Sequence, residues 1–222
     1  MSRNMIFAED EYYHFYNRGV DKRIIFQDER DYERFLSLLF LSNSDKKFEF
    51  NKLGEREKWS FTKAIEIYDG EKIVQIGAYC LMTNHFHILI KVKSQEGASQ
   101  FMHKLATGYT MYFNKKYHRT GSLFEGTFKS QHVNEDRYLK YLFSYIHLNP
   151  IGIIDCGWKK KEITDRKLAL EFLNTYKYSS LKDYLNEQRE ESVILYRESF
   201  PQYDFSFENM IIEWLDYSLC EA

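Results

Sequence analysis

The sequence is poor in the residues that interrupt or cross-link a chain, with 2 prolines and 3 cysteines among 222 residues. Cys80, Cys156 and Cys220 are odd in number and far apart, which argues against a disulfide framework and against a Cys-x-x-Cys zinc knuckle. No run of eighteen apolar residues is present, so we expect no membrane span. The first ten residues lack the apolar stretch of a signal peptide. These absences favour a globular protein of the cytoplasm.

An excess of charge of one sign is also lacking, because 31 Lys and Arg face 33 Asp and Glu for a net charge of −2. The distribution is nevertheless uneven. Residues 187–222 carry nine acidic and two basic side chains, a net of −7, which leaves +5 on residues 1–186. We therefore expect one domain at 1–186 followed by an acidic C-terminal extension at 187–222. A mildly basic body permits a polyanionic partner without requiring one.

The chain alternates between strand-like and helix-like segments, as judged from hydrophobic periodicity and helix-ending signals. The predicted elements are a strand at 11–18, a helix at 28–41, strands at 72–82 and 84–92 joined by a turn, a helix at 94–117, a strand at 128–133 and a helix at 136–149. Residues 42–70 are polar and mixed in pattern, which indicates an insertion or a long connection. This α+β order predicts one antiparallel sheet with helices packed on it, and the ferredoxin-like arrangement is one instance.

Two histidines stand one residue apart in an apolar run at residues 83–91. In a strand, residues two apart point to the same face, so His85 and His87 project together while Phe86 and Ile88 face the other way. Two adjacent imidazoles are half of a divalent-metal site. The pair is equally consistent with two structural histidines that have backbone or water partners. We read the other five histidines as non-ligands; they are His14, His103, His118, His132 and His147.

A tyrosine and an amide share one face of the helix predicted at 136–149. Tyr145 and Asn149 are four residues apart, a spacing that places two side chains one above the other. Such a pair could supply a nucleophile and a carbonyl-oxygen ligand. The alternative is a tyrosine at the rim of the core and an asparagine that ends the helix before Pro150.

The loop at residues 115–129 is basic and aromatic, with four cations against the single acid Glu125. Lysine and arginine interleaved with rings suit a single-stranded nucleic acid, because cations follow phosphates and rings stack on bases. A solvated surface loop is the simpler alternative. The candidate DNA-contacting residues, in this loop and at the end of the first strand, are Asn17, Arg18, Lys115, Lys116, Arg119 and Lys129.

Taken in order, these features resemble the single-tyrosine HUH transposases, which are IS200-like, and especially the REP-associated tyrosine transposase branch. The matching stretches are residues 17–19, 78–89, 119–130 and 137–150, followed by Tyr178-Ser179-Ser180 with Asp183-Tyr184. The resemblance covers about residues 11 to 185. One departure is Thr83, where the family often carries proline.

The resemblance implies a ferredoxin-like enzyme that cuts and rejoins single-stranded or hairpin DNA. Tyr145 would be the nucleophile that forms a 5′-phosphotyrosine. His85, His87 and Asn149 would be the ligands of a divalent metal, Mg²⁺ or Mn²⁺. The family includes dimers, but its REP-associated branch favours a monomer over a homodimer here.

Two other functions stay open at this point. The chain could be a catalytically inactive protein that binds hairpin DNA. It could also be a zinc hydrolase whose ligands are Cys80, His85 and His87 with His103 or His132, in the manner of other nitrogen and sulfur zinc sites.

Overall fold

Four strands form one antiparallel sheet in the computed structural model, which describes residues 6–47, 60–160 and 162–218. The strands are β1 (Tyr12–Arg18), β2 (Val74–Leu81), β3 (His85–Val92) and β4 (Lys129–Val133). Their order across the sheet is β2-β3-β1-β4. With α1 between β1 and β2 and α3 between β3 and β4, this is the ferredoxin-like βαββαβ topology. The predicted fold class is confirmed, including the β2–β3 hairpin.

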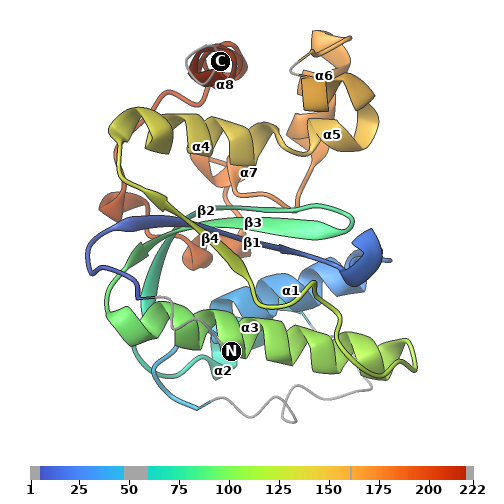
Figure 1. The fold of residues 1–222 in the computed structure, drawn as a ribbon, viewed down its shortest axis with the longest axis vertical. Coiled ribbons are helices and arrows are strands. Elements are labelled where there is room, and N and C mark those ends of the chain that lie inside the picture. The colour runs from blue at the N-terminus through green and yellow to red at the C-terminus, as the bar shows by residue number, and fades with distance from the viewer. Residues whose placement is uncertain (1–5, 48–59, 161, 219–222) are drawn as a thin grey trace.

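Helices cover both faces of this sheet (Figure 1). The helices of the described residues are α1 (Glu29–Leu41), α2 (Phe61–Ile67), α3 (Gln95–Lys116), α4 (Asp136–Leu148), α5 (Ile151–Ile154), α6 (Arg166–Thr175), α7 (Leu181–Tyr184) and α8 (Phe207–Ser218). The helices predicted from the sequence correspond to α1, α3 and α4, each within two residues at either end.

The face below the sheet in Figure 1 carries α1 and α3 over an aromatic core. Both helices begin at side-chain caps: Asp28 and Asp31 form a capping box at α1, and Ser94 accepts a hydrogen bond from Gly97 at α3. Phe15 and Phe86 are fully buried between sheet and helices. Because these residues alternate with polar ones along their strands, the opposite face is left for other chemistry.

The face above the sheet carries α4, with α7 and α8 beside it (Figure 1). Leu142, Phe143 and Ile146 bury the apolar side of α4 against this second core. Trp214 of α8 stacks on Trp158 with ring centroids 4.1 Å apart. The side of α4 that carries Tyr145 then faces His14 of β1 and His87 of β3.

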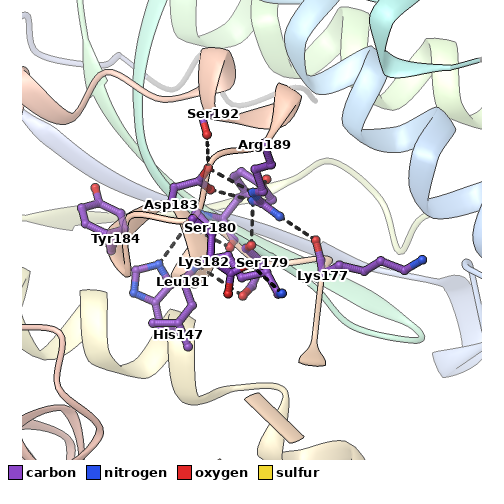
Figure 2. A network of polar contacts seen from close by, with 12 residues as sticks. His147, Lys177, Ser179, Ser180, Leu181, Lys182, Asp183, Tyr184, Arg189 and Ser192 are labelled. Carbon is purple, nitrogen blue, oxygen red and sulfur yellow. Dashed lines mark hydrogen bonds and ion pairs between the residues drawn. The ribbon is translucent and has the colours of Figure 1, made fainter. Parts of the chain in front are cut away.

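A buried ion pair joins residues 177–192 to β2, and we call it the Asp183–Arg189 cluster (Figure 2). The Asp183 carboxylate is 1% exposed and accepts hydrogen bonds from Arg189 Nε at 3.0 Å, Arg189 Nη2 at 2.6 Å and Ser192 Oγ at 2.6 Å. Arg189 Nη2 also donates to the Ser179 carbonyl at 2.9 Å and the Tyr79 hydroxyl at 2.6 Å. A charged network of this kind fixes the segment because each member depends on the others.

Ser180 connects this segment to both the sheet and α4. Its hydroxyl oxygen accepts a hydrogen bond from the Tyr79 backbone N at 2.9 Å and lies 2.8 Å from His147 Nε2. Figure 2 shows His147 reaching the serine from below the cluster. His147 therefore faces away from Tyr145 and packs within the second core.

Part of the connection predicted at 42–70 is helical: Phe61 and Ala64 of α2 are buried toward α1. Residues 48–59 of that connection lie outside the described residues. Residues 187–215, predicted as the beginning of an acidic extension, include the buried apolar side chains Leu195 and Phe200 against β2. None of the helices within the described ranges has the length and apolar character needed to cross a bilayer.

Candidate active site

His85 and His87 lie side by side on the face of β3 that α4 covers. Their ring centroids are 5.0 Å apart, and the ring planes are perpendicular. His87 is 5% exposed, whereas His85 at the start of the strand is partly exposed. The intervening Phe86 points into the opposite core. The strand period predicted from the sequence therefore puts both imidazoles on one surface.

The proton of the His85 ring can be assigned from its neighbour Asn84. Asn84 Nδ2 donates to the Lys22 carbonyl at 3.1 Å, so its Oδ1 is the atom that lies 2.6 Å from His85 Nδ1. An amide oxygen only accepts hydrogen bonds, and His85 Nδ1 must therefore carry the proton. In the neutral form of this ring, Nε2 is then the basic nitrogen.

His87 has an equivalent contact on its Nδ1, made by His14 of β1. His14 Nε2 lies 2.9 Å from His87 Nδ1. Burial lowers the pKa of His14 to about 3, and burial together with the two neighbouring histidines holds the pKa of His87 well below its usual range. Both rings are neutral at pH 7. His87 Nε2 is buried and has no hydrogen-bond partner among the described residues. A buried polar atom without a partner calls for an explanation, and a role in binding an ion is one such explanation.

Tyr145 of α4 approaches His87, and Asn149 at the end of the same helix lies beside Tyr145. The ring centroids of Tyr145 and His87 are 5.4 Å apart, and a side-chain hydrogen bond joins Tyr145 to Asn149. Asn149 is 3% exposed, while Tyr145 is partly exposed. Burial raises the pKa of the Tyr145 hydroxyl, and the Asn149 hydrogen bond opposes that shift. The phenol is therefore protonated at neutral pH, with an amide beside it that favours the ionised form.

The donor set fits a divalent ion. Imidazole nitrogens and an amide oxygen are ligand types found for Mg²⁺, Mn²⁺ and Zn²⁺, with imidazole more common on Zn²⁺ and oxygen more common on Mg²⁺ and Mn²⁺. The His85–His87 pair lies on β3 and the Tyr145–Asn149 pair on α4, and the contact between the His87 and Tyr145 rings joins these two elements. A nucleophile beside a potential ligand set is the arrangement expected of a metal-assisted transfer enzyme.

A family model described as IS200-like transposase matches residues 9–149, which include all four of these residues. The chain belongs to this transposase family. Among solved structures, it is similar to a REP-associated tyrosine transposase bound to a REP hairpin. The two share 11% identity and a TM-score of 0.54 over 93% of this chain and 94% of the other, a likeness that concerns the fold. A comparison with curated protein sequences gave no match.

In this IS200-like transposase, the loop before β4 is attached next to the histidine pair. Arg18 is the register partner of His85 across β1 and β3. The Arg18 guanidinium forms a two-point ion pair with Glu125, one of whose contacts is 3.0 Å. Asn17, 4% exposed, lies 3.4 Å from the Gly126 carbonyl through its Nδ2 and accepts from the Arg18 backbone N. Glu125 thus holds the loop against β1.

The other predicted DNA contacts differ in their surroundings. Lys129 is exposed at the start of β4, and Lys115 is exposed near the end of α3. Arg119 Nη1 donates to the Asn114 side chain at 2.8 Å. Lys116 is 23% exposed and lies 2.7 Å from both the Asp28 and Asp31 carboxylates. Lys116 is therefore already neutralised within the transposase by two carboxylates, which makes it a poor candidate for DNA contact.

The structure does not support the ligand set of the zinc-hydrolase alternative. Within the described parts of the chain, no three His, Cys, Asp or Glu side chains are grouped in a way that could hold a metal. His132 contacts the Tyr13 ring on the core side of α3 and lies 3.1 Å from Glu11. His14, read from the sequence as a non-ligand, is instead adjacent to the site. Only the pairing of β1 with β3 brings it there, so no local pattern could have indicated it.

Proposed function

We propose that this transposase-family protein cuts and rejoins single-stranded DNA through a covalent bond between Tyr145 and DNA. The observation that carries the proposal is the meeting of Tyr145 and Asn149 from α4 with His87 and its neighbour His85 on β3. A nucleophile, the amide beside it and two imidazoles are then grouped between α4 and β3. The family supports DNA transposition or the processing of REP elements as the setting.

The covalent step uses the phenol oxygen of Tyr145. Its Oη attacks the phosphorus, the phosphorus–O3′ bond breaks, and the fragment on the 3′ side of the break becomes attached to the tyrosine through its 5′ phosphate. The phenol proton is lost to solvent, and the leaving 3′ oxygen takes up a proton to become a hydroxyl. Rejoining reverses these steps with a 3′ hydroxyl as nucleophile, and the phosphotyrosine conserves the phosphoester bond so that no ATP is required.

Asn149 has two parts in this proposal. Its side chain already hydrogen-bonds Tyr145, where it favours the phenolate that attack requires. Its amide oxygen completes a ligand set with His85 and His87 for Mg²⁺ or Mn²⁺. When bound, such an ion supplies Lewis-acid polarisation of a phosphoryl oxygen, which is worth several kcal/mol. The orphaned Nε2 of His87 is the feature of this chain that supports a metal at these residues.

A hairpin is the substrate class suggested by the similar solved structure, in which a REP-associated tyrosine transposase is bound to a REP hairpin. Arg18 and Lys129 flank the histidine face and would contact phosphates, with Arg119, Lys115 and Asn17 as further candidates. One tyrosine per site implies one strand per site, and we propose a monomer as the acting form.

The test is an adduct assay. The protein is incubated with Mn²⁺ and a labelled hairpin with a single-stranded flank, and a denaturant-resistant protein–DNA product is expected. Tyr145→Phe should abolish it. The matched control is Tyr141→Phe, one turn earlier on α4 with its ring centroid 5.9 Å from that of Tyr145, which should retain it.

Three results would contradict parts of the proposal. An adduct that persists in Tyr145→Phe removes this residue as the nucleophile. Cleavage that is unaffected by EDTA removes the metal. Hairpin binding without any adduct, with all metals supplied, would favour the inactive DNA-binding alternative.

A further inference from the structure

His14 of β1 lies within hydrogen-bond distance of His87, one of the proposed metal ligands. His14 pairs with Leu89 in the β1–β3 register, and Tyr16 pairs with His87, so the two histidines meet diagonally across the strands. Their rings are stacked at 25° with centroids 5.0 Å apart, and His14 is 6% exposed. The contact of 2.9 Å joins His14 Nε2 to His87 Nδ1.

The geometry leaves two arrangements of protons for this contact. In a nitrogen-to-nitrogen hydrogen bond, one ring donates and the other accepts. If His14 donates, the proton of a neutral His87 sits on Nε2, where it is buried without an acceptor in the described part of the chain. If His87 donates through Nδ1, its Nε2 carries a lone pair instead. An unpaired buried N–H is the less tolerable of the two unless a ligand intervenes, and a lone pair is what a metal requires.

His85 already has its proton on Nδ1. Its Nδ1 donates to Asn84, and its Nε2 is the basic nitrogen. The two neighbouring imidazoles would then present the same nitrogen to a shared ion, each held by a partner on Nδ1.

We infer that His14 is a positioning residue that accepts a hydrogen bond from His87 Nδ1 and thereby fixes the tautomer whose Nε2 can bind the divalent ion. The inference rests on the metal site proposed above. Partners of this type orient metal-bound histidines and raise their basicity, and their loss typically lowers metal affinity or activity by about 10- to 100-fold. His14 itself does not touch the metal or the DNA in this account.

The first measurement needs no variant. Long-range ¹H–¹⁵N spectra of the metal-free protein at pH 7 report which ring nitrogen of each histidine is protonated. We expect His87 to carry its proton on Nδ1. A proton on Nε2 of His87 would overturn the role of His14.

The second measurement is Mn²⁺ affinity by calorimetry, without DNA. His14→Phe keeps an aromatic ring but removes the acceptor, and should weaken Mn²⁺ binding by about 10- to 100-fold while moving the His87 proton to Nε2. His14→Gln retains an acceptor oxygen and should recover most of the affinity. His132→Phe is the matched control, because His132 is a ring on the adjacent strand β4 that faces the other core.

The results separate the two proposals. If His87→Ala weakens Mn²⁺ binding but His14→Phe binds as tightly as the wild type, the role of His14 is overturned and the metal site stands. If His87→Ala binds Mn²⁺ as tightly as the wild type, the metal site is overturned, and the role of His14 with it. Equal losses in His14→Phe and His14→Gln, with the His87 tautomer unchanged, would indicate packing alone and overturn the inference.

Discussion

Breaking the Asp183–Arg189 cluster should destabilise the protein strongly. Arg189→Met keeps most of the arginine stem but removes the guanidinium that neutralises Asp183. The carboxylate, which is 1% exposed, then keeps the hydrogen bond from the Ser192 hydroxyl but loses both hydrogen bonds from Arg189. Removing one partner of a buried ion pair costs about 3–5 kcal/mol, because the other charge stays desolvated. For a domain of this size, that corresponds to a loss of about 6–20 °C in the melting temperature.

The assay is urea unfolding at pH 7, followed by circular dichroism, with thermal melting as a second measure. Arg166→Ala is the control, since Arg166 is exposed on α6 and its loss should change the unfolding free energy by no more than about 0.5 kcal/mol. The double variant Asp183→Leu with Arg189→Met removes both charges, so it should be more stable than the sum of the single losses predicts. A loss below about 1 kcal/mol in Arg189→Met would refute the reasoning.

Three further predictions concern the site and its surroundings. His14 and His147 have folded-state pKa values near 3 because of burial, so between pH 6.5 and 3 the unfolded chain binds more protons than the folded one. Stability should therefore fall as the pH drops below 6.5, by up to about 1.4 kcal/mol per pH unit for each group, and a flat profile in urea unfolding would contradict this. Lys129→Ala should reduce the slope of log binding constant against log salt concentration for hairpin DNA by about one, the loss of one phosphate contact. Lys167→Ala on α6 should leave this slope unchanged. Asn84→Ala removes the acceptor of the His85 Nδ1 hydrogen bond and should weaken Mn²⁺ binding by about tenfold in calorimetry. Wild-type affinity in this variant would refute a role of Asn84 in orienting His85.

Local patterns were sufficient for much of the fold. Alternation in residues 84–92 predicted both a strand and the face that His85 and His87 share, because a strand has a period of two. The spacing of Tyr145 and Asn149 predicted their common helix face for the analogous reason. Each of these conclusions depends only on neighbours within about one turn or one strand.

The features that the sequence did not reveal all depend on distant partners. Lys116 appears in the sequence as one more cation of a basic loop, but Asp28 and Asp31 neutralise it from 85 or more residues away. The His14 contact likewise depends on strand register. The composition of residues 187–222 indicated only an acidic extension, since the few apolar residues that enter the core, such as Phe200, are diluted by surface carboxylates.

The alternation of side chains along β3 also determines which kinds of mutation the site can tolerate. His85 and His87 occupy one face because β3 pairs with β1 and β2 in a fixed register, and Phe86 fills the core behind them. A shift of one residue would turn the phenylalanine toward α4 and both imidazoles into the aromatic core. An insertion or deletion of one residue in the tight turn before His85 is therefore expected to inactivate the site where many substitutions would not. Lengthening the long connection at 42–70 moves no strand out of register, and evolution is freer to vary it.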